Sequence, residues 1–266
     1  MAKRVRTTPK NPQLYRVEVR RAERLTPHLH RVTVGGEALA SFPWMRFDHW
    51  FRLFVRLPHQ SGFAMPEISG KKWWKQYLEI PEQVRPHCAN YTVADLRPAD
   101  RELDIDFVVH RGADGEPAGQ AAIWACATTP GEQLAVLDQG ILFDPPADAS
   151  EVTIVADETG LPGVTGILRS LSPDTVGRVI QEVPTAADRR ELARPAGVEV
   201  RWIDRDDHSV VPGVRALTAL RSLEAVDAGG YGFVVGESTL ATEGRRHLHR
   251  IGLPKDRITF SGFWKH

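Results

Sequence analysis

The first half of the chain carries apolar residues at alternate positions in short runs, the spacing of half-buried β-strands. Such runs occur around residues 14–19, 30–34, 48–57, 91–93, 103–109 and 133–137. Proline and glycine mark turns between them, as at Thr26-Pro27 and Thr129-Pro130-Gly131. A helix is expected from about residue 116 through Trp124. Many short strands separated by turns predict an antiparallel β-barrel over about residues 13–143.

The pattern changes after Asp144-Pro145-Pro146, where continuous apolar runs replace the alternation. Residues 152–156 form such a run, as expected for a strand buried on both faces. Further strands are predicted at 179–183, 198–203, 231–235 and 258–263, and helices at 161–171, 185–193, 211–223 and 239–251. Alternating strands and helices predict a Rossmann-like parallel sheet with helices on both faces. The expected fold class is therefore a β-barrel plus an α/β domain, over residues 1–146 and 147–266.

Composition narrows the class of protein. The 266 residues are 42% apolar and 26% charged, which is typical of a globular protein with a core. The 34 basic and 34 acidic residues give a net charge of +0, which argues against a nucleic-acid binder. We expect no membrane segment, because no apolar run reaches the ~18–20 residues needed to span a bilayer. Cys88 and Cys126 make neither a disulfide framework nor a metal site, and residues 1–10 lack the apolar segment of a signal peptide, so we expect a cytoplasmic protein.

Common catalytic motifs are missing from the sequence. It contains no G-x-S-x-G elbow and no P-loop. His247 and His249 are two residues apart on a predicted helix, so they point to different faces and do not form a chelating pair. The sequence therefore assigns no catalytic acid or base and no metal ligand.

Several short segments follow one another along nearly the whole chain and carry a resemblance. They are His30–Thr33, Asn90–Val93, Glu102–His110, Pro130–Gly140, Asp157–Pro162, Glu182–Pro184, Gly236–Ser238 and Ser261–Trp264. Together they resemble the siderophore-interacting protein family of FAD-dependent, ferredoxin-reductase-like ferric-siderophore reductases. The resemblance implies a flavin-reductase-type barrel that binds FAD, followed by an NAD(P)-binding-type domain.

The family's flavin motif is Arg-x-Tyr-Thr-x-Arg, in which the Tyr-Thr pair faces the isoalloxazine ring and the arginines hold phosphate. Tyr91 and Thr92 keep this frame, but the arginine positions hold Ala89 and Ala94. A guanidinium binds phosphate oxygens with two parallel hydrogen bonds, which an apolar side chain cannot replace. The resemblance places cofactor-binding residues at Asn90, Tyr91, Thr92, Val93, His110, Pro117, Ala118, Gly119, Asp157, Thr159, Gly236 and Trp264.

Two interpretations of the altered motif are open. In the first, FAD is held weakly or in a new orientation. The helix N-terminus after Gly119 then binds its phosphates, and one or more of Arg85, Arg97 and Arg111 replace the missing motif arginines. Alternatively, those arginines are ordinary surface residues and the chain has lost its flavin. Tyr and Thr are also common strand residues in any barrel, so Tyr91 and Thr92 do not decide between the two.

The resemblance implies that a nicotinamide nucleotide docks beside Asp157–Pro162 and Gly236–Ser238. Asp157 and Glu158 would complement a helix dipole but repel a diphosphate. Simple helix-capping roles for Thr159 and Ser238 explain these segments equally well. NAD(P)H is therefore a possible cofactor whose site the sequence does not establish.

Basic residues are the expected attraction for a ferric siderophore, because these ligands are often anionic. Arg46 and Arg52 are candidates, and the predicted substrate-binding residues are Lys71, Lys72, Trp73, Lys75 and Lys265. The segment with Trp73 and Trp74 could form a lid over an aromatic ligand. It could also be an exposed loop whose tryptophans cover the end of the barrel.

Two functions follow from these patterns. The first is a flavin-dependent reductase of ferric siderophores, Fe(III) to Fe(II), with electrons from NAD(P)H or a reduced ferredoxin. The second is a flavin-free descendant that binds, cyclises or isomerises a small apolar molecule in the vacated cleft, as in natural-product biosynthesis. Either function implies a small-molecule partner and a monomer or homodimer.

Overall fold

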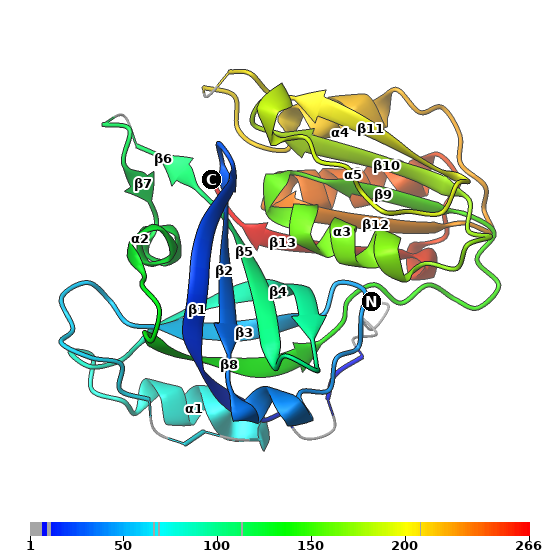
Figure 1. Cartoon of the computed structure of the whole chain (residues 1–266). Coiled ribbons are helices and arrows are strands. Elements are labelled where there is room, and N and C mark those ends of the chain that lie inside the picture. Colours follow the sequence, from blue (N-terminus) through cyan, green and yellow to red (C-terminus); the bar gives the residue numbers. More distant parts are fainter. Residues whose placement is uncertain (1–6, 10–11, 66, 69, 113, 208) are drawn as a thin grey trace. The chain divides into compact units, whose positions relative to one another are not determined.

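The structure is a computed structural model that describes residues 7–9, 12–65, 67–68, 70–112, 114–207 and 209–266. It divides into two units (Figure 1). Among the described residues, one unit contains those within 8–45 and 49–140, and the other contains Thr7, residues 46–48 and those from 141 onward. Residues 46–48 therefore leave the first unit and pack with the second.

The first unit is a closed barrel of six strands in the order β1-β2-β5-β4-β3-β8, and every neighbouring pair is antiparallel. The strands are β1 (Leu14–Thr26), β2 (Leu29–Gly35), β3 (Trp50–Val55), β4 (His87–Arg97), β5 (Glu102–Val108) and β8 (Gln133–Gly140). The antiparallel barrel predicted from the alternating pattern is confirmed.

Short elements cover both sides of the barrel wall. They are η1 (Glu37–Ser41), η2 (Gly70–Lys72), α1 (Trp73–Leu78), the hairpin β6 (His110–Arg111) and β7 (Pro117–Ala118), and α2 (Gln120–Ala127). Trp124 of α2 packs into the apolar interior, whereas Tyr77 of α1 packs over Phe54 on the outer face. The barrel therefore has an apolar interior and a second apolar cluster on the outer side of β3 and β8.

The second unit is a parallel sheet in the order β11-β10-β9-β12-β13. Its strands are β9 (Val152–Ala156), β10 (Gly177–Val183), β11 (Val198–Asp204), β12 (Tyr231–Glu237) and β13 (Ile258–Trp264). Its helical elements are η3 (Glu158–Gly160), α3 (Leu161–Ser170), η4 (Ala186–Asp188), α4 (Val214–Arg221), α5 (Ser238–Arg250) and η5 (Lys255–Arg257). Figure 1 shows α3 on one face of the sheet and α5 behind it, so the predicted Rossmann-like domain is confirmed.

The helix predicted over residues 185–193 is wrong. Only the single turn η4 forms there, and a capping box stabilises its start, since the Asp188 carboxylate accepts hydrogen bonds from the backbone N–H and hydroxyl of Thr185. Arg189 then adopts an extended conformation and pairs with Asp204 of β11. The helical path therefore ends after one turn, where the backbone becomes extended at Arg189.

Candidate functional site

β4 carries the residues that the flavin motif singles out. Successive residues of a strand point to opposite faces, so Ala89, Tyr91 and Val93 share the face that looks into the barrel. Val93 is buried in the core, and the half-buried ring of Tyr91 lies 4.5 Å from the ring of Phe107. Burial raises the pKa of Tyr91 far above its ordinary value, so its hydroxyl stays protonated. The inner face therefore offers a fixed aromatic wall.

The outer face of β4 carries Asn90 and Thr92, which the motif groups with Tyr91. Asn90 lies opposite Arg52 of β3 and is exposed, and Thr92 lies opposite Trp50. The Arg52 guanidinium carbon lies 5.5 Å from the Trp50 ring and 5.4 Å from the Trp73 ring. Tyr91 and Thr92 thus lie on different faces of β4. Arg52 and the two tryptophans lie on the outer face.

The second part of the predicted flavin site is the start of α2. His110 of β6 pairs with Ala118 of β7, and Gly119 follows with φ = 89°, a conformation that favours glycine. No side chain caps α2, so the first N–H groups of the helix are available to an acceptor. α2 packs against β4. The structure therefore brings His110, Pro117, Ala118 and Gly119 together at the uncapped start of α2, a helix end that favours an anion.

The two alanines leave no cation at the positions of the motif arginines. Ala89 is half-buried, and Ala94 is only 4% exposed, at an irregularity between β4 and β5. Arg85 does not replace them. Its guanidinium donates hydrogen bonds to the carbonyl oxygens of Ile80 and Leu78, at 2.7 to 3.0 Å.

The other two candidate substitutes are also engaged. Arg97 binds Asp104 with both terminal nitrogens, at 2.7 and 2.8 Å, and also pairs with Glu102. Arg111 donates a hydrogen bond of 2.8 Å to the carbonyl oxygen of Gly115. The residues present thus offer the Tyr91 ring to the flavin ring and the uncapped start of α2 to an anion, but they supply no side-chain cation for the diphosphate.

Acidic and apolar residues alternate along β5, which predicts a solvent-exposed face for Asp104 and Asp106, and this prediction is wrong. Asp104 and Asp106 are both buried. The guanidinium of Arg31 binds Asp106 at 2.6 and 2.9 Å, and Arg97 binds Asp104. The alternation correctly predicted a polar face on this strand. It did not reveal that arginine side chains cover the carboxylates of that face.

Residues predicted at the nicotinamide site meet at the carboxyl edge of the parallel sheet. Asp157 accepts hydrogen bonds from the N–H and hydroxyl of Thr159 and, at 2.6 Å, from the N–H of Glu237. A Cβ on Gly236 would lie 2.5 Å from the Asp157 carboxylate, so only glycine fits there. Burial, and then the charge of Glu158, raise the pKa of Asp157 from 3.8 to about 7.

A buried ion-pair cluster lies beside Asp157, and sequence reasoning did not identify it. Arg205 binds Glu158 through two hydrogen bonds of 2.8 Å and Glu182 through one of 2.9 Å. Glu182 also accepts hydrogen bonds from the N–H groups of Gly213 and Ala216 at the start of α4. Carboxylates therefore occupy the helix end that a diphosphate would use. No local motif announces this cluster, because its members come from three separate segments.

The predicted substrate-binding residues are scattered. Lys72 precedes α1 and is exposed, and Lys75 is exposed and pairs with Glu79 at 3.9 Å. The Trp73 ring packs edge-on against Phe54, at 6.2 Å between ring centres. The side chain of Lys71 lies outside the described residues.

The C-terminal candidates lie at the end of β13 in the other unit. Trp264 is half-buried, and its carbonyl oxygen accepts a hydrogen bond of 2.7 Å from Ser238. Lys265 is exposed. Ser238 thus ties the start of α5 to the end of the sheet.

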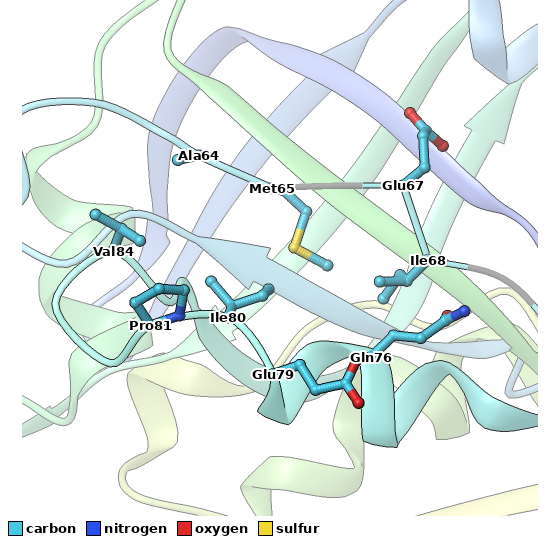
Figure 2. Close-up of a pocket in the computed structure, with 9 residues that line it drawn as sticks. All are labelled: Ala64, Met65, Glu67, Ile68, Gln76, Glu79, Ile80, Pro81 and Val84. Atoms are coloured by element: carbon cyan, nitrogen blue, oxygen red, sulfur yellow. The ribbon is translucent and has the colours of Figure 1, made fainter.

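A hollow of about 620 Å³ lies beside α1 (Figure 2). Figure 2 shows Met65, Ile68 and Ile80 turned toward its middle, and all three are buried. The charged residues that line it are Glu67 and Glu79. An apolar hollow with acidic rims does not suit an anionic ferric siderophore, so it lends no support to the predicted lysine site.

Comparisons with known proteins agree on one family. A family model described as the siderophore-interacting FAD-binding domain matches residues 18–141, and one described as siderophore-interacting protein matches residues 149–266. The chain is 28% identical to the ferric vibriobactin reductase of Vibrio cholerae, over 92% of this chain and 87% of the relative. It is 27% identical to the NADPH-dependent ferric-chelate reductase of Escherichia coli, over 97% of this chain and 98% of the relative.

Solved structures give the same answer. A siderophore utilization protein from T. fusca superposes with a TM-score of 0.79 at 27% identity, covering 98% of this chain and 97% of that one. A siderophore-interacting protein from Aeromonas hydrophila superposes with a TM-score of 0.75 at 25% identity, covering 97% and 100%. In the part of the chain that the structure describes, no helix has both the length and the apolar character to cross a membrane.

Proposed function

Because the chain belongs to the siderophore-interacting protein family, we propose that it reduces ferric siderophores, Fe(III) to Fe(II), with a flavin in the barrel. The electrons come from NAD(P)H or a reduced ferredoxin. A bound flavin would supply the one-electron transfer to iron, and the chain would supply binding and orientation. We further propose a cytoplasmic monomer or homodimer.

The observation that carries this proposal is that the barrel unit contains both the Tyr91 ring and the uncapped start of α2. Tyr91 presents an aromatic ring supported by Phe107, and α2 begins at Gly119 without a side-chain cap. An aromatic wall suits a flavin ring, and unpaired N–H groups suit phosphate oxygens. This arrangement retains two of the contacts that a flavin nucleotide needs.

We propose that the anionic substrate binds from the outer face of β3 and β4. There, Arg52 lies beside Trp50 and Trp73, and exposed Lys72 and Lys75 add positive charge. A guanidinium among indole rings suits an aromatic, negatively charged ligand. Lys71 remains a proposed substrate-binding residue, and Lys265 is a separate candidate in the other unit.

The flavin is held loosely in this proposal. Each lost charge-assisted contact to a diphosphate is worth roughly 1.5–3 kcal/mol. Two such losses weaken binding by about two to four decades. The chain therefore takes up its flavin reversibly, and the carboxylates around Asp157 and Glu182 disfavour a tightly bound dinucleotide at the sheet edge.

One specific observation favours a second function. Ala89 and Ala94 remove both motif cations, and Arg85, Arg97 and Arg111 are each engaged elsewhere. A flavin-free descendant would use the inner side of β4 to bind, cyclise or isomerise a small apolar molecule. Such a function works by shape and a few polar groups.

The visible spectrum of the purified protein, followed by FAD titration, tests the choice. The reductase predicts a flavin spectrum that appears or grows during titration, and Fe(II) trapped by a chromogenic chelator when ferric siderophore and a reductant are added. A colourless protein whose spectrum and intrinsic fluorescence do not respond to FAD would refute the reductase and support the flavin-free function.

A further inference from the structure

A second hollow, of about 350 Å³, opens in the barrel unit beside β1 and β8. Tyr15 of β1 and Asp138 of β8 lie in its wall, and Gln13, Ser41 and Met45 also line it. These residues all belong to one unit. Its lining residues come neither from β4 nor from the hollow in Figure 2.

Asp138 is the unusual member of this wall. Its side chain is 1% exposed, and its Oδ1 accepts hydrogen bonds from Nε2 of His49 at 2.7 Å and from the N–H of Gly140 at 3.1 Å. Within the described residues, Oδ2 accepts no hydrogen bond, and no Lys or Arg pairs with this carboxylate. One oxygen of a buried carboxylate is thus left for something else.

His49 does not neutralise Asp138. The backbone N–H of Met45 donates a hydrogen bond of 3.1 Å to Nδ1 of His49, so Nδ1 must be an acceptor and the proton is on Nε2. The imidazole is therefore neutral and donates to Asp138. His49 therefore supplies Asp138 with a hydrogen bond but with no positive charge.

Other buried carboxylates show what is missing here. Asp104 and Asp106 are covered by arginines, Glu158 and Glu182 share Arg205, and Asp157 caps a helical turn. Each of these groups finds a cation or several donors within the chain. Asp138 finds only a neutral imidazole and one backbone N–H.

The rest of the wall defines the chemistry of a complementary ligand. The Tyr15 hydroxyl donates to the carbonyl oxygen of Ser41 at the long distance of 3.5 Å, so its lone pairs can accept a hydrogen bond. Burial, and then the charge of Asp138, raise the pKa of Tyr15 and keep the phenol protonated. Met45 adds apolar surface. Two acceptors with an apolar neighbour suit a cation that carries N–H donors and an alkyl chain.

We propose that this hollow binds a primary ammonium group on a short aliphatic chain, with Oδ2 of Asp138 and the Tyr15 hydroxyl as acceptors. A divalent metal ion needs more ligands, and the described residues contain no group of three His, Cys, Asp or Glu side chains able to hold one. The proposal does not depend on the flavin or on iron reduction.

Methionine methyl groups provide the test. The chain has three methionines. Met45 lines this hollow, whereas Met65 lines the other hollow, shown in Figure 2. Full-length protein with ¹³C-methyl methionine is titrated with n-butylammonium at constant ionic strength, with the signals assigned from Met45→Leu and Met65→Leu. We expect a saturable shift of the Met45 signal and no shift of the Met65 signal.

The controls separate charge, hydrogen bonding and fold. Tetramethylammonium has the charge without N–H donors, and n-butanol has the chain without the charge, so neither should shift Met45. Asp138→Asn should weaken n-butylammonium binding at least about tenfold, since a hydrogen bond to a charged group is worth roughly 1.5–3 kcal/mol. Tyr15→Phe should weaken it severalfold, and an unchanged Met65 signal shows that both variants are folded.

Three outcomes overturn the proposal. The Met45 signal does not move with n-butylammonium, or it moves together with that of Met65, which indicates non-specific binding. In the third, potassium or sodium ions produce the same saturable shift, so the hollow is a site for a monovalent metal ion.

Discussion

Ala89 and Tyr91 share one face of β4, and α2 with its uncapped start packs against this strand. An arginine at position 89 would therefore extend from the half-buried rim on the same side as the tyrosine ring. The side chain at position 94 is different, because it is buried at an irregularity of the strand. Position 89 is thus the better place to restore a phosphate contact.

Ala89→Arg is expected to lower the dissociation constant for FAD about tenfold or more, because one charge-assisted contact contributes roughly 1.5–3 kcal/mol. Riboflavin has no phosphate, so its affinity should not change. Fluorescence titration with both flavins measures the difference. Asn90→Arg is the matched control, since it adds the same charge on the opposite face of β4. An equal gain in both variants would show that only net charge matters.

The raised pKa of Asp157 predicts how the stability of the protein depends on pH. This pKa is raised from 3.8 to about 7 in the folded chain, by burial first and by Glu158 second. Between these values the unfolded chain releases a proton that the folded chain keeps. This residue therefore costs stability progressively as the pH rises from about 4 to about 7, and nothing further above that.

Urea unfolding at a series of pH values checks this expectation. The slope of unfolding free energy against pH over that window should be less negative, or more positive, in Asp157→Asn than in the parent chain. A change on the order of 1 kcal/mol or more is expected across the window. Identical pH profiles for the two proteins would contradict the raised pKa.

At the level of single residues, the sequence identified the right types but not their partners. It named Arg85, Arg97 and Arg111 as possible phosphate ligands, and the fold engages each of them with a carbonyl or carboxylate. Those partners depend on how the loops and strands fold, and residue spacing does not contain that information. The pairing of Asp138 with His49 was missed for the same reason.

Among the elements, α3 and the segment 46–48 fit together closely. The backbone N–H of Phe47 donates a hydrogen bond of 3.0 Å to the Ser170 hydroxyl, and the Phe47 ring stacks on Phe143 at 5.7 Å. A Cβ on Gly166 would lie 2.2 Å from the carbonyl oxygen of Phe47. Gly166 is therefore required by this contact, although glycine is a poor helix former.

Gly166→Ala is expected to destabilise the protein by about 1–3 kcal/mol, because the clash with backbone outweighs a gain of about 1 kcal/mol in helix propensity. Urea unfolding gives the value. Gly62→Ala is the control, since a Cβ there meets nothing within 4 Å, and its effect should stay within about 0.5 kcal/mol. A more stable Gly166→Ala protein would show that segment 46–48 does not pack as described.

Hydrophobic periodicity predicted most elements because it reports directly which side of a strand or helix is buried. The strand at 152–156 and the helices that became α3 and α5 follow this rule. It failed for residues 185–193, where the chain becomes extended at Arg189 and pairs with Asp204 after a single turn, and for β5, where arginines enclosed acidic side chains. Both errors come from side-chain hydrogen bonds, which periodicity does not register.

For the molecule as a whole, the balance of 34 basic and 34 acidic residues removes any long-range attraction for an anion. Attraction to the proposed substrate must then come from local groups such as Arg52, Lys72 and Lys75. Electrostatic steering depends on the summed field of the protein. The association rate with an anionic ferric siderophore should therefore depend only weakly on salt.

Stopped-flow quenching of the seven tryptophans measures this rate. Between low and physiological ionic strength we expect less than about a twofold change, because local contacts are screened little over a few ångströms. A neutral ferric siderophore, measured in the same way, is the control. A tenfold fall for the anionic ligand alone would reveal a strongly basic surface around the entrance.

Family and architecture were accessible from the sequence because many short segments agreed in order along the chain. The barrel, the parallel sheet and the family are all confirmed. The state of the flavin was not accessible, since two alanines remove a contact without saying what replaces it.

The excursion of residues 46–48 restricts how the gene can be divided. A fragment that stops at residue 140 carries Phe47 without Gly166, Ser170 and Phe143, while one that begins at residue 141 lacks the loop that fills the surface of α3. Each truncated product would expose apolar surface that is buried in the full chain, and this surface would favour aggregation or proteolysis. The boundary between the two units therefore does not coincide with a single cut in the chain.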